Sequence, residues 1–304
     1  MVATIIQPGE IQPPAGEAPF LRLPERNTLF SQRAERLNTL AQGHAMAGYL
    51  LFMGKLAQAQ QHALNSHSPV PIPDGSRLTL CREHGMPPLS VQDWPRDPSW
   101  QAVLKKIIRE IEPDAPPATR HTIERLNKAD SGALESCAQD ILAGNFARLD
   151  VAAAPLVAAA LQVYWTYMST SLGARAFGRN DPPYLCPVCA SPPVASVIRI
   201  GQEQGLRYLH CSLCATEWNM VRIKCSNCEN TKGIVYYSIE GTSGAVKAET
   251  CDACGSYLKI MVMEKDPYVD PVADDLASLA LDILMDGHGL VRSGPNLFVV
   301  SSSG

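Results

Sequence analysis

The chain has 304 residues, of which 46% are hydrophobic and 18% are charged, and its formal net charge is −4. This length is sufficient for two domains that each bury a hydrophobic core. The mildly acidic balance argues against a nucleic-acid-binding protein, because such proteins need a basic face to displace the counterions of the phosphate backbone.

The first segment, residues 1–24, is rich in proline and glycine and is predicted to be a disordered tail. It carries Glu10 and Glu17 and has no basic stretch followed by an apolar stretch. A secretory signal peptide would have both features. The segment therefore offers no support for export to an oxidising compartment, which structural disulfides would need.

Residues 25–180 are predicted to form a mainly helical domain. Apolar residues recur at helical spacing from Leu29 to Ala41, and proline-rich residues 65–76 read as a connection. Asp97 and Pro98 supply a cap and a first-turn proline for a helix that Pro113 ends. The other helices are expected at Met46–Leu64 and at residues 117–128, 132–144 and 152–176.

The segment Val151–Ala174 contains no charged residue across 24 positions. That length could span a bilayer. However, the segment is mostly alanine, contains Pro155 and several polar residues, and lacks a flanking cluster of Lys or Arg. We interpret it as a buried central helix, with no membrane insertion.

Residues 181–265 contain a duplicated cysteine motif. Four Cys-x-x-Cys pairs are present, and the first two recur 39 or 40 positions later, so one unit (181–222) is followed by a second (223–265). In each unit two short alternating runs flank a glycine-containing turn, which predicts a β-hairpin. A hairpin brings its two flanking pairs together. The expected metal ligands are Cys186, Cys189, Cys211 and Cys214 for site 1, and Cys225, Cys228, Cys251 and Cys254 for site 2.

Some alternatives remain open at this point. A crossed-brace pairing of the motifs would ignore the duplication, and structural disulfides would need an oxidising compartment. Zinc and iron both accept four thiolates, and spacing does not separate them. A rubredoxin-type iron site typically has glycine after its knuckle, whereas only Cys254 is followed by one, Gly255. With four thiolates each, both sites look closed, which favours a structural or electron-transferring role.

The remaining candidate residues do not form a catalytic set. Cys81 and Cys137 stand alone and are interpreted as buried or free thiols. His210 adjoins Cys211 and could touch a metal-bound sulfur. We predict no catalytic residue, no bound organic cofactor and no enzyme activity. Beyond the metal module, residues 266–304 are expected to form one last helix, Val272–Asp286, and a tail.

Three stretches resemble a known family. They are residues 274–282 with Gly294-Pro295-Asn296 beyond them, residues 33–37 (Arg-Ala-Glu-Arg-Leu), and residues 211–218 around the second cysteine pair. Together they resemble the bacterial formate dehydrogenase accessory protein FdhE, from about residue 22 to the end. The fold class expected is α+β, with a mainly helical N-terminal domain, a duplicated rubredoxin-like or zinc-ribbon module and a C-terminal helix.

The resemblance implies a cytoplasmic, non-catalytic maturation factor. Its partner would be the catalytic subunit of a respiratory formate dehydrogenase, an exported, membrane-associated enzyme that carries molybdenum and selenocysteine. Two metal ions per chain are expected, with iron favoured and zinc as the alternative. An electron carrier that uses two four-cysteine iron sites is the rival hypothesis, and homo-oligomerisation stays open.

Overall fold

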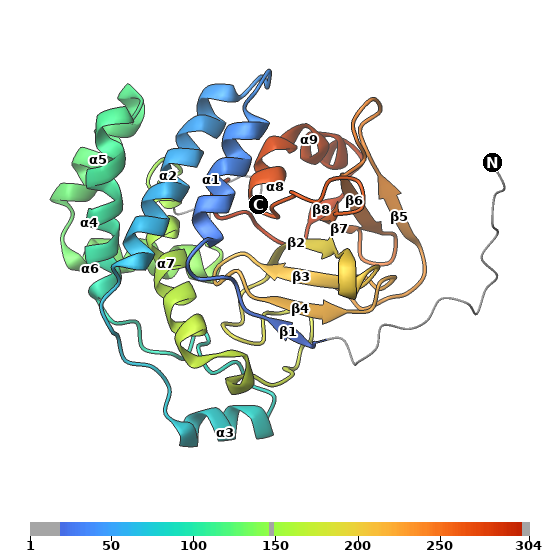
Figure 1. Cartoon of the computed structure of the whole chain (residues 1–304), viewed down its shortest axis with the longest axis horizontal. Helices are drawn as coiled ribbons and strands as arrows, with labels where there is room; N and C mark the ends of the chain where they lie inside the picture. The colour runs from blue at the N-terminus through green and yellow to red at the C-terminus, as the bar shows by residue number, and fades with distance from the viewer. Residues whose placement is uncertain (1–18, 146–148, 300–304) are drawn as a thin grey trace.

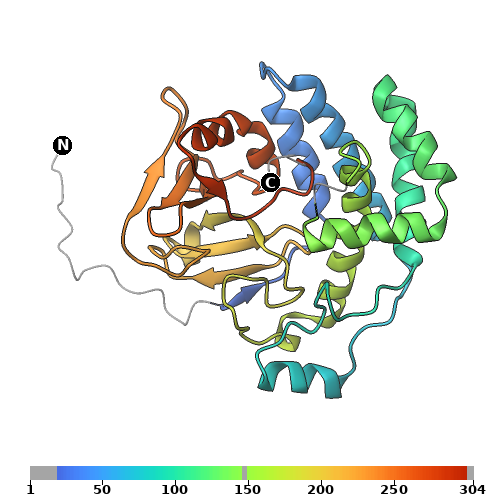
Figure 2. The same ribbon diagram turned by 180° about the vertical axis from the view of Figure 1, so that it is seen from behind.

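The computed structural model describes residues 19–145 and 149–299, so residues 1–18 and 300–304 of the predicted tails lie outside the described part of the chain. Figures 1 and 2 show most of the helices on one side of the molecule and the sheet on the other, with the last two helices lying against the sheet. The helices of the first part are α1 (Leu29–Leu40), α2 (Ala47–Asn65), α3 (Gly75–Glu83), α4 (Ser99–Ile111), α5 (Pro117–Lys128), α6 (Ser131–Ala143) and α7 (Ala154–Leu172).

The uncharged segment forms the central helix α7, and the prediction of a buried helix is confirmed. Leu161, Val163 and Trp165 are fully buried in the core, which α2, α4 and α6 help to enclose. The polar side chain of Gln162 has a partner there: its side-chain oxygen accepts a hydrogen bond from Gln60 at 3.0 Å. Within residues 19–145 and 149–299, no helix is both long and apolar enough to cross a bilayer.

Helix α3 was not predicted. The prolines of the preceding connection end at Pro73, and Asp74 then caps the helix by accepting a hydrogen bond from the Arg77 backbone N–H at 2.9 Å. An aspartate before a helical run is a start signal. The rest of the helix gives little further signal, because it has little apolar periodicity of its own.

The predicted last helix, Val272–Asp286, is wrong as a single element. It divides at Ser278 into α8 (Ala273–Ala277) and α9 (Leu279–Gly287). The cause is the buried Lys259 ammonium group, which donates to the backbone oxygens of Asp275 and Ser278 at 3.0 and 3.1 Å. From the backbone, the two carbonyl oxygens accept hydrogen bonds from residues three positions ahead, Ser278 at 3.2 Å and Leu281 at 2.9 Å, so the chain makes tighter turns there than an α-helix.

The strands form one mixed sheet. Among the described residues its order is β1-β4-β3-β2-β7-β6-β5, with β8 beside β7. Leu21 and Arg22, which the sequence placed in the tail, pair with β4 as strand β1. The bounds are β1 (Leu21–Arg22), β2 (Pro193–Ile198), β3 (Arg207–Cys211), β4 (Glu217–Met220), β5 (Ile234–Tyr237), β6 (Val246–Cys251), β7 (Ser256–Val262) and β8 (Val291–Arg292).

The duplication is visible in the sheet. Each unit is a hairpin, β2-β3 or β5-β6, to which a third antiparallel strand, β4 or β7, is added after the second knuckle. The two units are joined by parallel pairing of β2 with β7, in which Val197 lies opposite Met261. The copies therefore repeat side by side in the same direction along one sheet.

Ion pairs fasten the first helix to the C-terminal region. Arg36 donates to Asp274 and Asp266 at 2.6 and 2.7 Å, and Arg33 donates to Asp270 at 3.1 Å. Arg33 is buried and has little access to water, so the Asp270 carboxylate is the hydrogen-bond acceptor that compensates its charge. Two of the stretches that carried the family resemblance, around Arg33 and around Asp274, thus meet in space.

Gly294 lies against the start of strand β2. A Cβ atom at this position would overlap the Pro193 carbonyl oxygen. Because that neighbour is backbone, the strand itself would have to move, and Pro193 follows the first knuckle of site 1 by only a few residues. We expect Gly294→Ala to lower the free energy of unfolding by about 3 kcal/mol, at the upper end of overpacking effects. Chemical denaturation measures it, and Gly287→Ala, which has open space, is the matched control. Equal stability of the two variants would contradict this packing.

Candidate metal centres

The structure brings the eight motif cysteines together in two groups of four. In site 1, the Sγ atom of Cys189 lies 3.4 Å from that of Cys211 and 3.6 Å from that of Cys214. In site 2, the Cys225–Cys254 and Cys228–Cys251 sulfur distances are 3.7 Å. All ligand atoms of a group lie within 4.8 Å of one another.

These dimensions fit a tetrahedral ion. Four sulfurs at about 2.3 Å from a common metal lie about 3.8 Å apart, close to the separations found here. All eight cysteines are free thiols. Each group could therefore hold one metal ion, and four thiolates would fill its coordination and leave no position for a substrate.

Each cysteine pair lies in a tight knuckle. The residue after the second cysteine has a left-handed backbone, with φ values of 64° at Ala190, 56° at Ala215, 62° at Glu229 and 64° at Gly255. Three of these residues are not glycine, and each such residue costs on the order of 1 kcal/mol or more. The chain thus adopts the same knuckle conformation at all four positions, although the sequence shows glycine at one.

Backbone N–H groups in the knuckles point at sulfur. The Cys211 sulfur accepts from the N–H groups of Leu213 and Cys214 at 3.4 Å, and the Cys225 sulfur accepts from Asn227 at 3.3 Å. Such donors stabilise a thiolate over a thiol, because they favour the charged form. The geometry is suited to anionic, metal-bound sulfur.

A second set of sulfur partners was not predicted from the sequence. The Thr216 hydroxyl lies 3.2 Å from the Cys214 sulfur, and the Ser256 hydroxyl lies 3.0 Å from the Cys254 sulfur. Ser191 holds the equivalent position after Cys189. A signal existed in the sequence, since a hydroxyl side chain stands two residues after the closing cysteine in three of the four motifs.

The two sites differ in burial. All four cysteines of site 1 are buried, whereas Cys228 and Cys254 of site 2 are exposed. Burial raises the pKa of the Cys186 and Cys211 thiols, whereas hydrogen bonds from neighbouring groups outweigh burial and lower the pKa of Cys189. Four buried thiolates would need a cation between them, because buried charges have to be paired. Partial burial would also raise the pKa of Cys254, but hydrogen bonds from Ser256 outweigh it and lower that pKa to about 6.

Site 1 is covered by the helical part of the chain. The N–H groups of Leu89 and Val91 donate to the carbonyl oxygens of Val188 and Cys189, both at 3.0 Å. From helix α7, the Gln162 side chain donates to the Ser212 carbonyl oxygen at 2.8 Å. These contacts hold both knuckles of site 1 against the hydrophobic core.

The other candidate residues lie elsewhere. Cys81 is buried and Cys137 is half-buried, and neither belongs to a cysteine group. Burial raises the pKa of Cys137 to about 11, as befits an inert thiol. His210 pairs with Glu217, whose carboxylate lies 3.2 Å from its Nδ1 atom.

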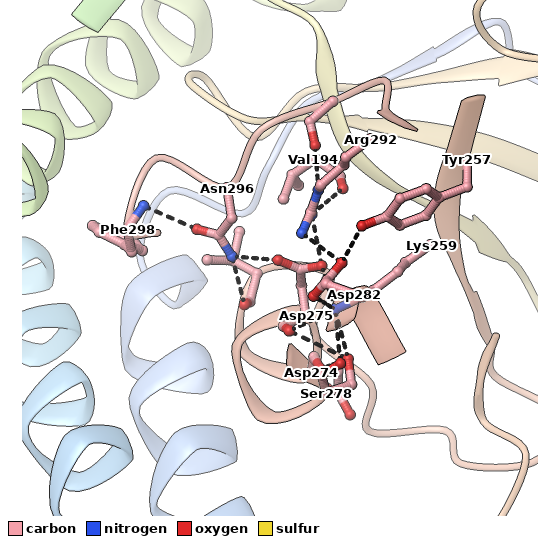
Figure 3. Close-up of polar contacts among 12 residues, drawn as sticks. Val194, Tyr257, Lys259, Asp274, Asp275, Ser278, Asp282, Arg292, Asn296 and Phe298 are labelled. Carbon is pink, nitrogen blue, oxygen red and sulfur yellow. Dashed lines mark hydrogen bonds and ion pairs between the residues drawn. The ribbon is translucent and has the colours of Figure 1, made fainter. Parts of the chain in front are cut away.

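Beside site 2, a buried polar network joins the sheet to α8 and α9 (Figure 3). Asp275 accepts from Arg292 at 2.7 Å and from Asn296 at 2.8 Å, and lies 3.1 Å from Lys259. Asp282 accepts from Lys259 at 2.6 Å and from Tyr257 at 2.8 Å. Both aspartates and Asn296 belong to the stretches that resemble the family. In the structure these residues hold α8 and α9 against the sheet.

Helices packed on a sheet that carries two groups of four cysteines, each able to hold one metal ion, define the class of this protein. Family models match along the chain: FdhE N-terminal at residues 18–180, the FdhE central domain at 185–222 and the FdhE C-terminal domain at 223–299. The chain belongs to the FdhE family.

Individual relatives cover nearly the whole chain. The "Protein FdhE homolog" of Edwardsiella ictaluri is 47% identical over 93% of this chain and 91% of its own length. That of Cronobacter sakazakii is 42% identical over 94% of this chain and 93% of its own length. The crystal structure of the FdhE protein from Pseudomonas aeruginosa is similar, with a TM-score of 0.87 at 40% identity, and covers 94% of this chain and 100% of that chain.

The two cysteine groups predict the metal content. Freshly purified, reduced protein should contain two metal ions per chain, because each group offers four sulfur ligands. Elemental analysis measures this. Cys81→Ser and Cys137→Ser should leave the content unchanged, since neither residue is in a group. One ion per chain, or none, would contradict the double site.

Proposed function

We propose that this protein is a non-catalytic accessory factor for a respiratory formate dehydrogenase. It binds the catalytic subunit of that enzyme in the cytoplasm, before the subunit is exported. The observation that carries this proposal is membership of the FdhE family over nearly the whole chain, including all three matched regions. The site residues are the eight cysteines, which hold two metal ions.

The chemistry of the sites supports a binding role. Four thiolates would close the coordination of each ion, so neither ion would have an open position at which to activate water or polarise a substrate. When bound, the ions supply cross-links that hold the knuckles in place. The residues of the chain then provide a rigid surface on which a protein partner can dock.

Deletion of the gene tests the proposal in the cell. Activity of the respiratory formate dehydrogenase should disappear, while other molybdenum enzymes keep theirs. Restoring the gene should restore activity, and a version with Cys225 and Cys228 replaced by serine should restore less of it. Intact formate dehydrogenase activity after deletion, or loss of all molybdenum enzymes together, would show that the assignment is wrong.

One observation favours a second candidate, an electron carrier. Cys228 and Cys254 are exposed, so an iron ion in site 2 would lie close enough to the surface for electron exchange with another protein. Both hypotheses expect two ions, but only the carrier requires iron that changes oxidation state.

The visible spectrum and the metal content test whether the protein can be an electron carrier. We expect iron, so protein purified without oxygen and then treated with a mild oxidant should be coloured by charge transfer from sulfur to Fe(III), and a reductant should bleach it by returning the iron to Fe(II). A colourless protein with two zinc ions per chain would exclude the electron carrier. It would leave the accessory role in place, because closed zinc sites are structural.

A further inference from the structure

Helix α9 carries apolar residues on two of its faces. Leu281 and Met285 point into the sheet and are buried. On the other side Ala280, Ile283 and Leu284 are exposed, and the exposed fractions of Ile283 and Leu284 are 73% and 50%. Positions i, i+3 and i+4 share one helix face, so these three residues form a single stripe. Surface helices normally carry polar residues there.

Two further exposed apolar side chains lie on the elements beside α9. The ring of Tyr237, on the free edge strand β5, stacks on His288 directly after α9, with ring centres 5.8 Å apart. Val291 in β8 is 70% exposed. We call the set the α9 surface; it consists of Tyr237, Ala280, Ile283, Leu284 and Val291. Exposed apolar side chains gathered on neighbouring elements are typical of an interaction site.

Negative charge borders the α9 surface. Asp286 is exposed next to the stripe on α9 itself. Beyond the helix, the Val291 N–H donates to the Gly255 carbonyl oxygen at 2.9 Å, which places β8 against the site 2 knuckle. That knuckle exposes Asp252 and Cys254. Four thiolates around a divalent ion keep a double negative charge, so a bound metal would make this border more acidic.

We propose that the α9 surface is the docking site for an amphipathic helix whose apolar stripe is flanked by Lys or Arg. A helix suits the surface because Ala280 and Gly287, at the two ends of the exposed stripe, are small enough for a second helix to approach closely. The acidic border selects a basic partner through charge complementarity. This proposal rests on the proposed function, in which an enzyme subunit supplies the helix.

A synthetic peptide tests the surface independently of the enzyme. The probe is a labelled helix of about 18 residues built from Leu and Lys, which is about five turns long. Its counterpart replaces every Lys with Glu. Fluorescence anisotropy should show binding of the basic helix at one site per chain, and no binding of the acidic helix.

Variants of the full chain then locate the site. Ile283→Gln with Leu284→Gln should weaken binding of the basic helix at least about tenfold, and Asp286→Lys should weaken it about threefold, as expected for losing apolar contact and one charge pair. Leu51→Gln, at a residue 46% exposed on α2, is the matched control and should bind like the wild type. All variants change exposed residues, so metal content and thermal unfolding should stay the same.

Several outcomes would overturn the proposal. Among them are unchanged affinity of the double glutamine variant, equal loss with Leu51→Gln, and equal binding of the acidic helix. Light scattering, which measures self-association of the chain, gives a further contradicting outcome. If the double glutamine variant no longer self-associates but keeps its affinity for the peptide, the α9 surface joins two copies of this protein instead.

The purified catalytic subunit of formate dehydrogenase separates this proposal from the proposed function. If the subunit binds the wild type and the double glutamine variant equally, the docking site is wrong and the proposed function stands. If the basic helix binds the α9 surface but the subunit binds neither protein, the proposed function fails and the surface keeps its specificity for a basic helix.

Discussion

Replacement of Cys186 and Cys189 by serine should prevent the protein from folding, whereas replacement of Cys225 and Cys228 should leave a folded chain with one metal ion. Structural zinc sites bind with about 10–16 kcal/mol, which is comparable with a whole domain's stability of about 5–15 kcal/mol. Site 1 is buried in the core that α7 shares, so losing its ion removes support from both halves. Circular dichroism and soluble yield measure the effect.

Because site 2 is more exposed than site 1, we expect the two ions to be removed at different rates. A chelator should take one ion quickly, through Cys228 and Cys254, and the second only as fast as the chain unfolds. The Cys225→Ser, Cys228→Ser protein should show only the slow phase. The account would be contradicted if both double replacements affected folding equally and if both ions were released at one rate. The two sites would then be equally important for folding and equally accessible.

The second large effect is expected at Asp275. Asp275→Asn keeps the shape of the side chain but removes the charge that faces Lys259 and Arg292, and Lys259 is fully buried. Breaking a buried pair in this way costs about 3–5 kcal/mol, because the remaining charge lacks compensation. The free energy of unfolding measured with urea should fall by that amount. Asp286→Asn, on exposed α9, should change it by less than about 0.5 kcal/mol.

Acid should lower the free energy of unfolding of the wild type in the same way, because it protonates Asp275. Burial alone would raise the pKa of Asp275, but Arg292 and Lys259 outweigh it and lower that pKa. A carboxyl group with a lowered folded-state pKa adds stability above its ordinary pKa of about 4, and this contribution is lost as the pH falls through the folded-state value. The Asp275→Asn variant should keep the rest of the pH profile, which comes from other groups. The wild type should therefore lose more of its free energy of unfolding than the variant as the pH falls below about 4. Equal losses in the two proteins would contradict a stabilising charge on Asp275.

Local patterns in the sequence predicted local structure well. The 39- and 40-residue repeat of the cysteine pairs, with glycine turns between them, indicated which knuckles a hairpin would bring together, and the structure groups the thiols in that way. The uncharged segment likewise predicted the buried helix α7. Both inferences depend on residues close together in the chain.

Contacts between distant segments could not be predicted in the same way. Nothing in the repeat indicates that β2 pairs in parallel with β7, since their partners are set by the packing of the whole sheet. The division of the last helix at Ser278 depends on Lys259, which comes from a strand 19 residues earlier. The left-handed backbone of Ala190 and Ala215 also lacks a local signal, because such strain persists only where the surrounding structure imposes it.

Copurification is the most direct test of the proposed accessory role. The full-length protein, tagged and produced at its native level, is isolated from cells that express the respiratory formate dehydrogenase, and the retained proteins are identified by mass spectrometry. The account predicts that the catalytic subunit of that enzyme is retained, and that replacing Cys225 and Cys228 by serine reduces the retained amount while the chain stays folded. Absence of the catalytic subunit from the wild-type complex would contradict it.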